Sequence, residues 1–137
     1  MAEILSFRTV FQYDIRKSGI TIPIRLEWNG RQTEFKAKVD SGSSACIVAR
    51  NYGEDLGLMI EKGHPQRFET VTGGFQTYGH EVTLSAGGLD LTTIVYFAAD
   101  PGITRNVLGR QGWLDRLRIG LVDYEGKLYL SHFNDAS

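Results

Sequence analysis

Residues 37–48 read Ala37-Lys38-Val39-Asp40-Ser41-Gly42-Ser43-Ser44-Ala45-Cys46-Ile47-Val48. An alternating apolar strand leads up to one carboxylate, and the chain then breaks through a small, hydroxyl-rich turn before an apolar run resumes. The pattern places Asp40 at the end of a rigid strand, among backbone amides and hydroxyls. A catalytic acid needs such support, because packing and neighbouring hydrogen bonds must hold it in position. Asp-Ser-Gly is also an ordinary turn sequence, so the rest of the chain must decide between a site and a structural turn.

The composition is ordinary for a soluble globular protein. The chain has 137 residues, of which 42% are hydrophobic and 23% charged, and its net charge is -1. This length favours a single domain over residues 1–137. Because no basic stripe is present, neither nucleic acid nor a membrane is expected as a partner. The N-terminus lacks the pattern of a signal peptide, and a lone cysteine suits a reducing compartment, so we expect a cytoplasmic protein.

The single cysteine, Cys46, raises the question of a thiol nucleophile. It lies in an apolar run, and none of the three histidines, at positions 64, 80 and 132, belongs to a recognisable pairing motif. Burial as a small hydrophobic residue is therefore the favoured interpretation. The spacing of the histidines indicates no metal site.

The segment before Asp40 predicts a hairpin. Residues 20–28 alternate between apolar and polar side chains, which is typical of a half-buried strand, and Pro23 places that strand near an edge or a bulge. Asn29-Gly30 predicts a tight turn, because both residues accept positive φ. Residues 31–39 then return as a second strand, and the turn aims this strand at Asp40.

The remainder of the chain predicts short strands separated by glycine turns. A brief helical turn is expected in 49–58, ending at Gly57, and a short helix at 110–117. The expected strands and hairpins are a strand at 46–48, a hairpin in 68–78 with its tip at Gly73-Gly74, a hairpin of 81–85 and 89–97 around Gly87-Gly88, and strands at 119–123 and 127–133. Regular short strands of this kind indicate an all-β barrel or sandwich with at most two small helices.

Three features follow one another along the chain: Asp40-Ser41-Gly42-Ser43 after a strand, a glycine-tipped hairpin at Thr72-Gly73-Gly74-Phe75, and Asn106-Val107-Leu108-Gly109-Arg110. This order resembles the retropepsin family, the single-domain aspartic proteases of retroviruses and their cellular and bacterial relatives, over roughly Ile22 to Leu130. The resemblance implies an all-β, retropepsin-like closed barrel with one or two short helices. It also implies a homodimer that acts on a peptide or protein substrate and needs neither a cofactor nor a metal.

The resemblance assigns roles residue by residue. Asp40 matches the catalytic aspartate, Ser41 the residue whose hydroxyl ties two active-site loops together across the dimer, and Gly42 the glycine that lets the substrate backbone approach. Ser43 resembles a hydroxyl residue that bonds the aspartate in the pepsin-like branch. Residues Thr72, Gly73, Gly74 and Phe75 resemble the flap that closes over the substrate, and Val107, Leu108 and Gly109 resemble the apolar segment that packs beneath the catalytic loop.

The chemistry of this family fits one aspartate per chain only in a dimer. The mechanism needs two carboxylates that share a proton, because two like charges about 3 Å apart cannot both ionise. One carboxyl group then acts as an acid and the other as a base that activates water. The implied enzyme is a homodimeric aspartic endopeptidase, with Asp40 of each subunit at the two-fold axis.

A second hypothesis competes with the enzyme. Viral members carry an acid at the position of Ser44, paired with the arginine that follows the later glycine, so Arg110 must find another partner here. Asp40 could be a structural turn residue, and Gly73-Gly74 an ordinary hairpin turn rather than a flap. The alternative is therefore a catalytically inactive retropepsin-fold dimerisation or peptide-binding module.

Overall fold

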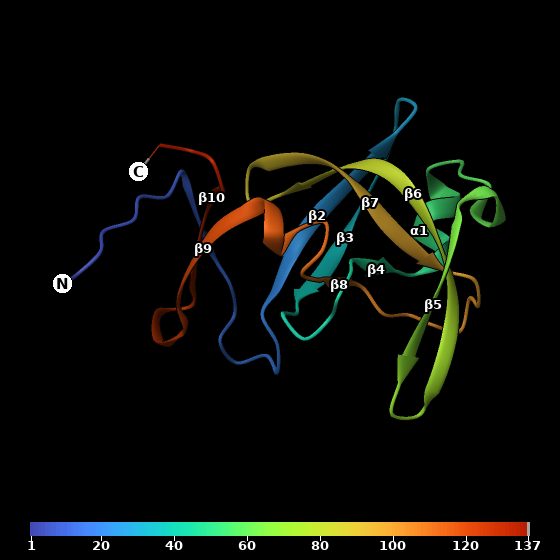
Figure 1. The fold of residues 1–137 in the computed structure, drawn as a ribbon, viewed down its shortest axis with the longest axis horizontal. Coiled ribbons are helices and arrows are strands. Elements are labelled where there is room, and N and C mark those ends of the chain that lie inside the picture. The colour runs from blue at the N-terminus through green and yellow to red at the C-terminus, as the bar shows by residue number, and fades with distance from the viewer. Residues whose placement is uncertain (137) are drawn as a thin grey trace.

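A computed structural model describes residues 1–136, and most of its regular structure is β-strand (Figure 1). No helix of this described part is long and apolar enough to span a membrane. The elements in chain order are β1 (Thr9–Gln12), β2 (Thr21–Trp28), β3 (Arg31–Val39), β4 (Ile47–Val48), α1 (Arg50–Asp55), η1 (Ile60–Lys62), β5 (His64–Thr70), β6 (Gly73–Ala86), β7 (Leu89–Ala98), β8 (Val107–Leu108), η2 (Leu114–Arg116), β9 (Leu117–Val122), η3 (Asp123–Glu125) and β10 (Lys127–His132).

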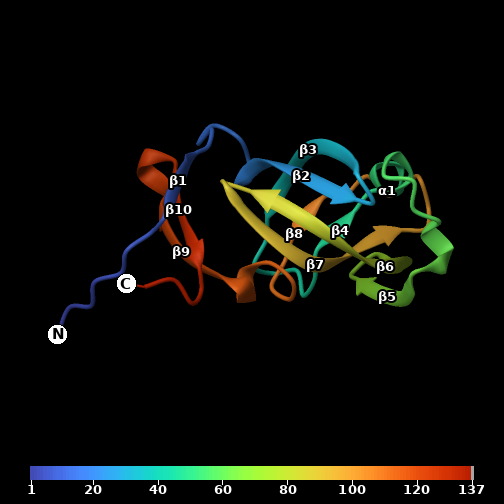
Figure 2. The same cartoon turned by 90° about the horizontal axis from the view of Figure 1, so that it is seen from above.

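The strands form two sheets that lie side by side (Figure 2). The larger has the order β2-β3-β8-β4-β7-β6-β5, and the smaller has the order β1-β10-β9. β2 also pairs with β6, so the pairing of the large sheet returns on itself. The ring is not a clean closed barrel, because β4 and β8 contribute only two residues each. The prediction of an all-β fold with few short helices is confirmed.

The first hairpin forms as its sequence predicts. Ile22, Ile24 and Leu26 alternate into the core and are almost completely buried. Asn29 and Gly30 adopt φ values of 50° and 81°, which a tight two-residue hairpin turn requires. β3 pairs antiparallel with β2 along its length and ends one residue before the expected catalytic aspartate.

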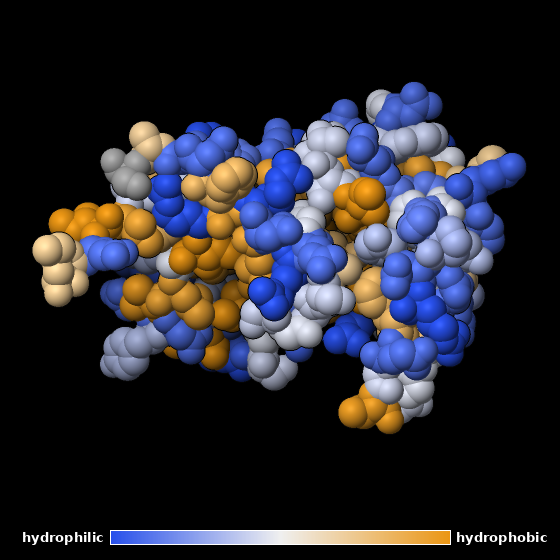
Figure 3. All heavy atoms as spheres, viewed as in Figure 1, coloured by the Kyte–Doolittle hydropathy of each residue, from blue (hydrophilic) through white to orange (hydrophobic). Residues whose placement is uncertain are grey.

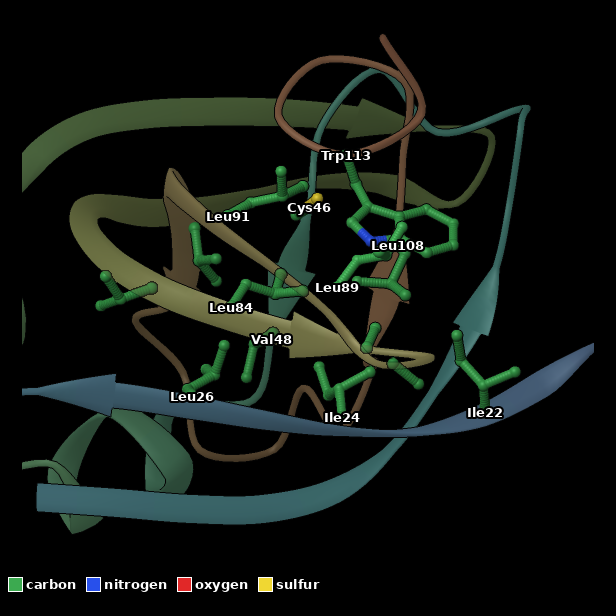
Figure 4. Close-up of a cluster of buried hydrophobic side chains, with 14 of the residues drawn as sticks. Ile22, Ile24, Leu26, Cys46, Val48, Leu84, Leu89, Leu91, Leu108 and Trp113 are labelled. Atoms are coloured by element: carbon green, nitrogen blue, oxygen red, sulfur yellow. The ribbon is translucent and has the colours of Figure 1, made fainter. Parts of the chain in front are cut away.

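The core joins both sheets. Figure 4 shows Cys46, which directly precedes β4, and Leu108 of β8, with Trp113 beside them. The same buried cluster contains Leu128 and Leu130 of β10, in the smaller sheet. This shared core supports a single domain over residues 1–137, which stays a prediction.

Two expected elements differ from those observed. The helix expected over 110–117 is only the 3-10 turn η2, because Gly112 has a φ of 101° and interrupts helical backbone before the buried Trp113. The strand following the second hairpin does not stop near Tyr78 but continues as β6 to Ala86. The third turn, Gly87-Gly88, is confirmed, with both glycines at positive φ.

Candidate active site

Asp40 is held at the end of β3 by backbone hydrogen bonds. Its N–H donates to the Leu108 carbonyl at 3.0 Å, and its carbonyl accepts from the Ser43 N–H at 3.1 Å. Its carboxylate oxygen Oδ1 accepts from the Gly42 N–H at 2.9 Å. The side chain is 27% exposed, so the carboxylate is fixed yet reachable from solvent.

The hydrogen bond from Gly42 does not by itself mark a site. Asp100 makes the same contact in an exposed turn, where its Oδ1 accepts from the Gly102 N–H at 2.8 Å. Such local bonds are common for aspartate in turns. Asp40 differs from Asp100 because β3 ends directly before it and a carbonyl of β8 accepts from its N–H. The surrounding strands, rather than the turn, distinguish the candidate catalytic aspartate.

β8 and Gly109, the apolar segment that the sequence singled out, pack against the Asp40 loop. Val107 and Leu108 are buried, and β8 pairs with both β3 and β4. At Gly109 the two backbones approach so closely that a Cβ would lie 2.2 Å from the Ala45 carbonyl oxygen and 2.7 Å from that of Ser43. Real Cβ contacts are never this short, so only glycine fits.

The serines of the loop occupy different environments. Ser41 is exposed and lines an open groove with Arg110, Leu114 and Asp115. Ser43 is buried, and its hydroxyl donates to the Ala45 carbonyl at 2.8 Å. The expectation that Ser43 bonds the aspartate is therefore wrong for this chain, because the hydroxyl satisfies a carbonyl of its own loop instead.

A cation that no sequence motif indicated lies beside Asp40. Nη2 of Arg105 is 3.7 Å from Asp40 Oδ2, whereas the Gly42 N–H donates to the other oxygen, Oδ1. The neighbouring Asn106 anchors this segment: its side-chain Oδ1 accepts from the Ala49 N–H and its carbonyl from the Lys38 N–H, both at 2.9 Å. Arg105 directly precedes the recognised Asn106-to-Arg110 motif, but nothing in its spacing indicated a partner 65 positions away.

The candidate flap is the hairpin of β5 and β6. Thr70 pairs with Gly73, so the tip is Val71-Thr72, and the prediction of a tip at Gly73-Gly74 is wrong by two residues. Gly73 has a φ of 124° and begins the returning strand. Phe75 lies opposite Phe68, with ring centroids 6.0 Å apart. Thr72 is at the exposed tip, and Gly74 follows Gly73 on β6.

The hairpin and the Asp40 loop lie on the same side of the molecule. In Figure 1 both are at the lower edge, the loop after the arrow of β3 and the hairpin at the lower right, and Figure 2 places them at a similar depth. Figure 3 shows the hairpin projecting from the body with a notch beside it. The hairpin therefore projects on the side of the molecule that carries the Asp40 loop.

Cys46 is excluded as the nucleophile by its environment. It is fully buried, and burial raises the pKa of its thiol to about 11. The thiol is therefore protonated near neutral pH, whereas the nucleophilic form is the thiolate. Within residues 1–136, no three His, Cys, Asp or Glu side chains are grouped so that they could hold a metal ion.

The fold and the loop together define the class of retropepsin-like acid proteases: all-β molecules with an Asp-Ser-Gly loop at the end of a strand and a packed apolar segment beneath it. A sequence model of aspartyl proteases matches residues 24–125. The match spans most of the chain, which therefore belongs to the aspartyl protease family. A search of curated proteins found no sequence match.

Proposed function

We propose that the protein is a homodimeric aspartic endopeptidase that hydrolyses peptide bonds with water activated between two Asp40 carboxylates, one from each subunit. The observation that carries the proposal is the placement of Asp40: a reachable carboxylate fixed by β3, β8 and the Gly42 N–H, in a member of the aspartyl protease family. The chain contains one Asp-Ser-Gly. Because the chemistry requires two carboxylates that share a proton, a second copy must supply the other.

The exposure of the loop supports this pairing. Ser41, Gly42 and Ser44 are exposed around the half-buried Asp40, so a second loop could approach along a two-fold axis. In such a dimer, the Ser41 hydroxyls would tie the two loops together, and Gly42 would leave room for a substrate backbone, since no side chain stands there. No metal or cofactor takes part in the proposed reaction, in which water is the nucleophile.

The smaller sheet offers apolar side chains that a second copy could cover. Leu114 and Asp115, which line the open groove with Ser41 and Arg110, belong to η2, and β9 follows η2 directly in the sequence. β9 pairs with β10 on one side only in residues 1–136, and Leu121 and Val122 near its end are exposed. Figure 3 shows apolar surface gathered over this smaller sheet. Exposed edges with apolar side chains pair readily with another strand.

The β5–β6 hairpin is proposed as the flap over the substrate. It lies on the side of Asp40, and its tip residues Val71 and Thr72 are exposed, as is Gly73 directly after them. Thr72 and Gly73 would approach the substrate backbone, whereas Gly74 and Phe75 would support the tip. A closing hairpin would exclude water and align the scissile bond with the two carboxylates.

The decisive experiment compares Asp40→Asn with Asp100→Asn. Asparagine keeps a side-chain oxygen that can accept the turn hydrogen bond at both positions, but it removes the ionisable group. We expect the purified wild type to digest casein or a peptide library at mildly acid pH, with inhibition by a pepstatin-type compound. Asp40→Asn should abolish digestion while the dimer persists, and Asp100→Asn should retain it. Hydrolysis by Asp40→Asn would end the proposal.

The alternative function, an inactive dimerisation or peptide-binding module, keeps a specific observation in its favour: no ion pair to the Arg110 side chain is present within residues 1–136, so the support expected in viral members is absent. Peptide binding by the wild type without turnover would establish this module instead. A cytoplasmic location, and the absence of nucleic acid and membranes among the partners, stay predictions from composition.

A further inference from the structure

We propose that Arg105 selects substrates that carry an acidic side chain next to the scissile bond. The inference rests on the proposed function and adds to it the chemical class of the substrate, an acidic peptide. It starts from the position of the Arg105 guanidinium, whose Nη2 lies 3.7 Å from Oδ2 of the candidate catalytic carboxylate.

The backbone that carries Arg105 is firmly held. Asn106, the next residue, accepts hydrogen bonds from the Ala49 N–H through its side chain and from the Lys38 N–H through its carbonyl. Val107 then enters β8, between β3 and β4. Residues mounted on fixed elements make precise binding groups, and the backbone of Arg105 is fixed by the anchored Asn106 beside it.

The guanidinium keeps most of its hydrogen-bonding capacity free. The contact with Asp40, at 3.7 Å, is longer than a hydrogen bond. Asp40 is the one carboxylate within ion-pair distance of Arg105 among the described residues, and the arginine side chain is 45% exposed. Arginine has five N–H donors in a planar fork that matches a carboxylate. A substrate carboxylate could therefore bind without breaking any strong contact.

The charge of the assembled site favours an acidic ligand. Two Asp40 carboxylates that share one proton carry a single negative charge, whereas two Arg105 side chains carry two positive charges. The nearby groove adds no net charge, because it contains both Arg110 and Asp115. On the hairpin, Arg67 is paired with Glu69 at 3.0 Å. The site is thus left with one uncompensated positive charge, and complementary charge gives specificity in recognition.

The geometry also limits where the acidic residue stands in the substrate. An extended peptide advances about 3.3 Å per residue, and the guanidinium contacts the carboxylate that acts on the scissile bond. The acidic side chain should therefore lie within one or two residues of that bond. Because the dimer places one Arg105 on each side of its axis, an acidic residue should be accepted on either side of the bond.

The test uses pairs of peptides that differ only by Glu or Gln at these positions. We expect kcat/KM to be about tenfold higher for the Glu peptide, the usual scale for a hydrogen bond between charged groups. Because the same enzyme cleaves both peptides, titration of its catalytic groups changes both kcat/KM values alike and leaves their ratio unchanged. It should fall towards one below pH 4, where the substrate glutamate is protonated, and should decrease with added salt.

Variants separate selection from support of Asp40. Arg105→Gln should bring the ratio close to one while the Gln peptide is still cleaved, and Arg105→Glu should reverse the preference towards a Lys peptide. Arg31→Glu is the matched control, since it makes the same change in an exposed arginine at the other end of β3, about 30 Å from Asp40. It should leave the ratio unchanged.

The outcomes distinguish this inference from the proposed function. A ratio near one in the wild type, an unchanged preference in Arg105→Glu, or an equal loss of cleavage of both peptides in Arg105→Gln would overturn it. If the wild type cleaves nothing, fluorescence anisotropy of the same labelled peptides gives the answer. Tighter binding of the Glu peptide that Arg105→Gln removes would then support acidic selection in a binding module, and equal binding would refute it.

Discussion

At the residue scale, the position of Asp40 depends on a close approach between two backbones. Gly109 lies against the carbonyl groups of Ala45 and Ser43, and the N–H of Arg110 donates to the Ser43 carbonyl at 2.9 Å. The loop that carries the carboxylate is therefore fastened from beneath by backbone contacts. A side chain at this position would push on atoms that cannot move without shifting the loop.

We predict that Gly109→Ala destabilises the protein by about 3 kcal/mol, because its methyl group would overlap backbone atoms in a packed region. The change should appear as a lower midpoint of urea unfolding, together with reduced hydrolysis. Gly102→Ala is the control: its Cβ would meet only side-chain atoms of Asp100, the nearest at 3.2 Å, in an exposed turn. Equal midpoints for the two variants would contradict the packing role of Gly109.

A second residue-scale prediction concerns Tyr13. Burial, with a further contribution from the hydrogen bond that its hydroxyl donates to Asp123, raises the pKa of Tyr13 to about 12. The unfolded chain releases this proton near pH 10, so the folded state binds more protons between the two values. The contribution of Tyr13 to stability is full below pH 10 and is lost as the pH rises through 12.

The measurement for Tyr13 is urea unfolding at pH 9 and pH 11.5. The wild type should lose more stability between these pH values than Tyr13→Phe, which has no phenol to titrate. Parallel losses in the two proteins would show that Tyr13 does not titrate as the structure indicates.

Local sequence predicted some site residues and missed others. Asp40, Gly42 and Gly109 could be found, because turn chemistry and a short apolar motif lie within a few residues of each. Arg105 could not, since its relation to Asp40 arises when β8 pairs with β3. The hydroxyl of Ser43 had several possible acceptors within its own loop, and sequence gives no basis for choosing among them.

At the element scale, β6 connects the candidate flap with the body of the molecule. The strand runs from Gly73 at the hairpin tip to Ala86, next to the Gly87-Gly88 turn. Its first residues pair with β5, and its later residues pair with both β7 and β2. The tip can therefore move or deform while the other end of the same strand stays within the sheet.

This arrangement predicts different effects for two similar substitutions. Gly73 and Gly88 have φ values of 124° and 83°, and neither position has an atom closer than 3.5 Å to an added Cβ, so alanine adds backbone strain without a clash. Each should cost about 1 kcal/mol or slightly more locally. We expect Gly73→Ala to reduce kcat/KM about tenfold with little change in Tm, because the flap must adopt one shape over the substrate.

Gly88→Ala is the matched control, at the far end of β6. It should leave kcat/KM close to the wild-type value, whatever its effect on Tm. Equal kinetic effects of the two variants, or none from Gly73→Ala, would refute the flap assignment.

The hairpins show how far elements follow from sequence. Turns at Asn29-Gly30 and Gly87-Gly88 were predicted correctly, because their positive φ values are a local requirement. The sequence prediction placed the tip of the β5–β6 hairpin two residues too late. Val71 and Thr72 form the turn, and only Gly73, directly after it, has a positive φ. The length of β6 and the pairing of β2 with β6, which brings the two parts of the large sheet together, depend on contacts between distant segments. Local sequence patterns do not predict such contacts.

At the scale of the whole molecule, the proposed chemistry requires that assembly and activity change together. One chain brings one carboxylate of the pair, so a monomer has no complete site. The exposed apolar residues near the free edge of β9 are the surface on which this requirement can be tested. Leu121 is 51% exposed there, whereas Ile94 is 45% exposed on β7, in the larger sheet.

We predict that Leu121→Lys shifts the protein from dimer towards the 15.3 kDa monomer and lowers hydrolysis in the same proportion. Dimer formation would bury the new lysine without a partner for its charge, which opposes association. Light scattering after size exclusion measures the mass, and the specific activity of the wild type should rise with protein concentration as dimers form. Ile94→Lys, an equal change in a comparably exposed side chain, should alter neither mass nor activity. A wild type that hydrolyses peptides as a monomer, with specific activity independent of concentration, would contradict the two-subunit site, since a second carboxylate would then have to come from the same chain.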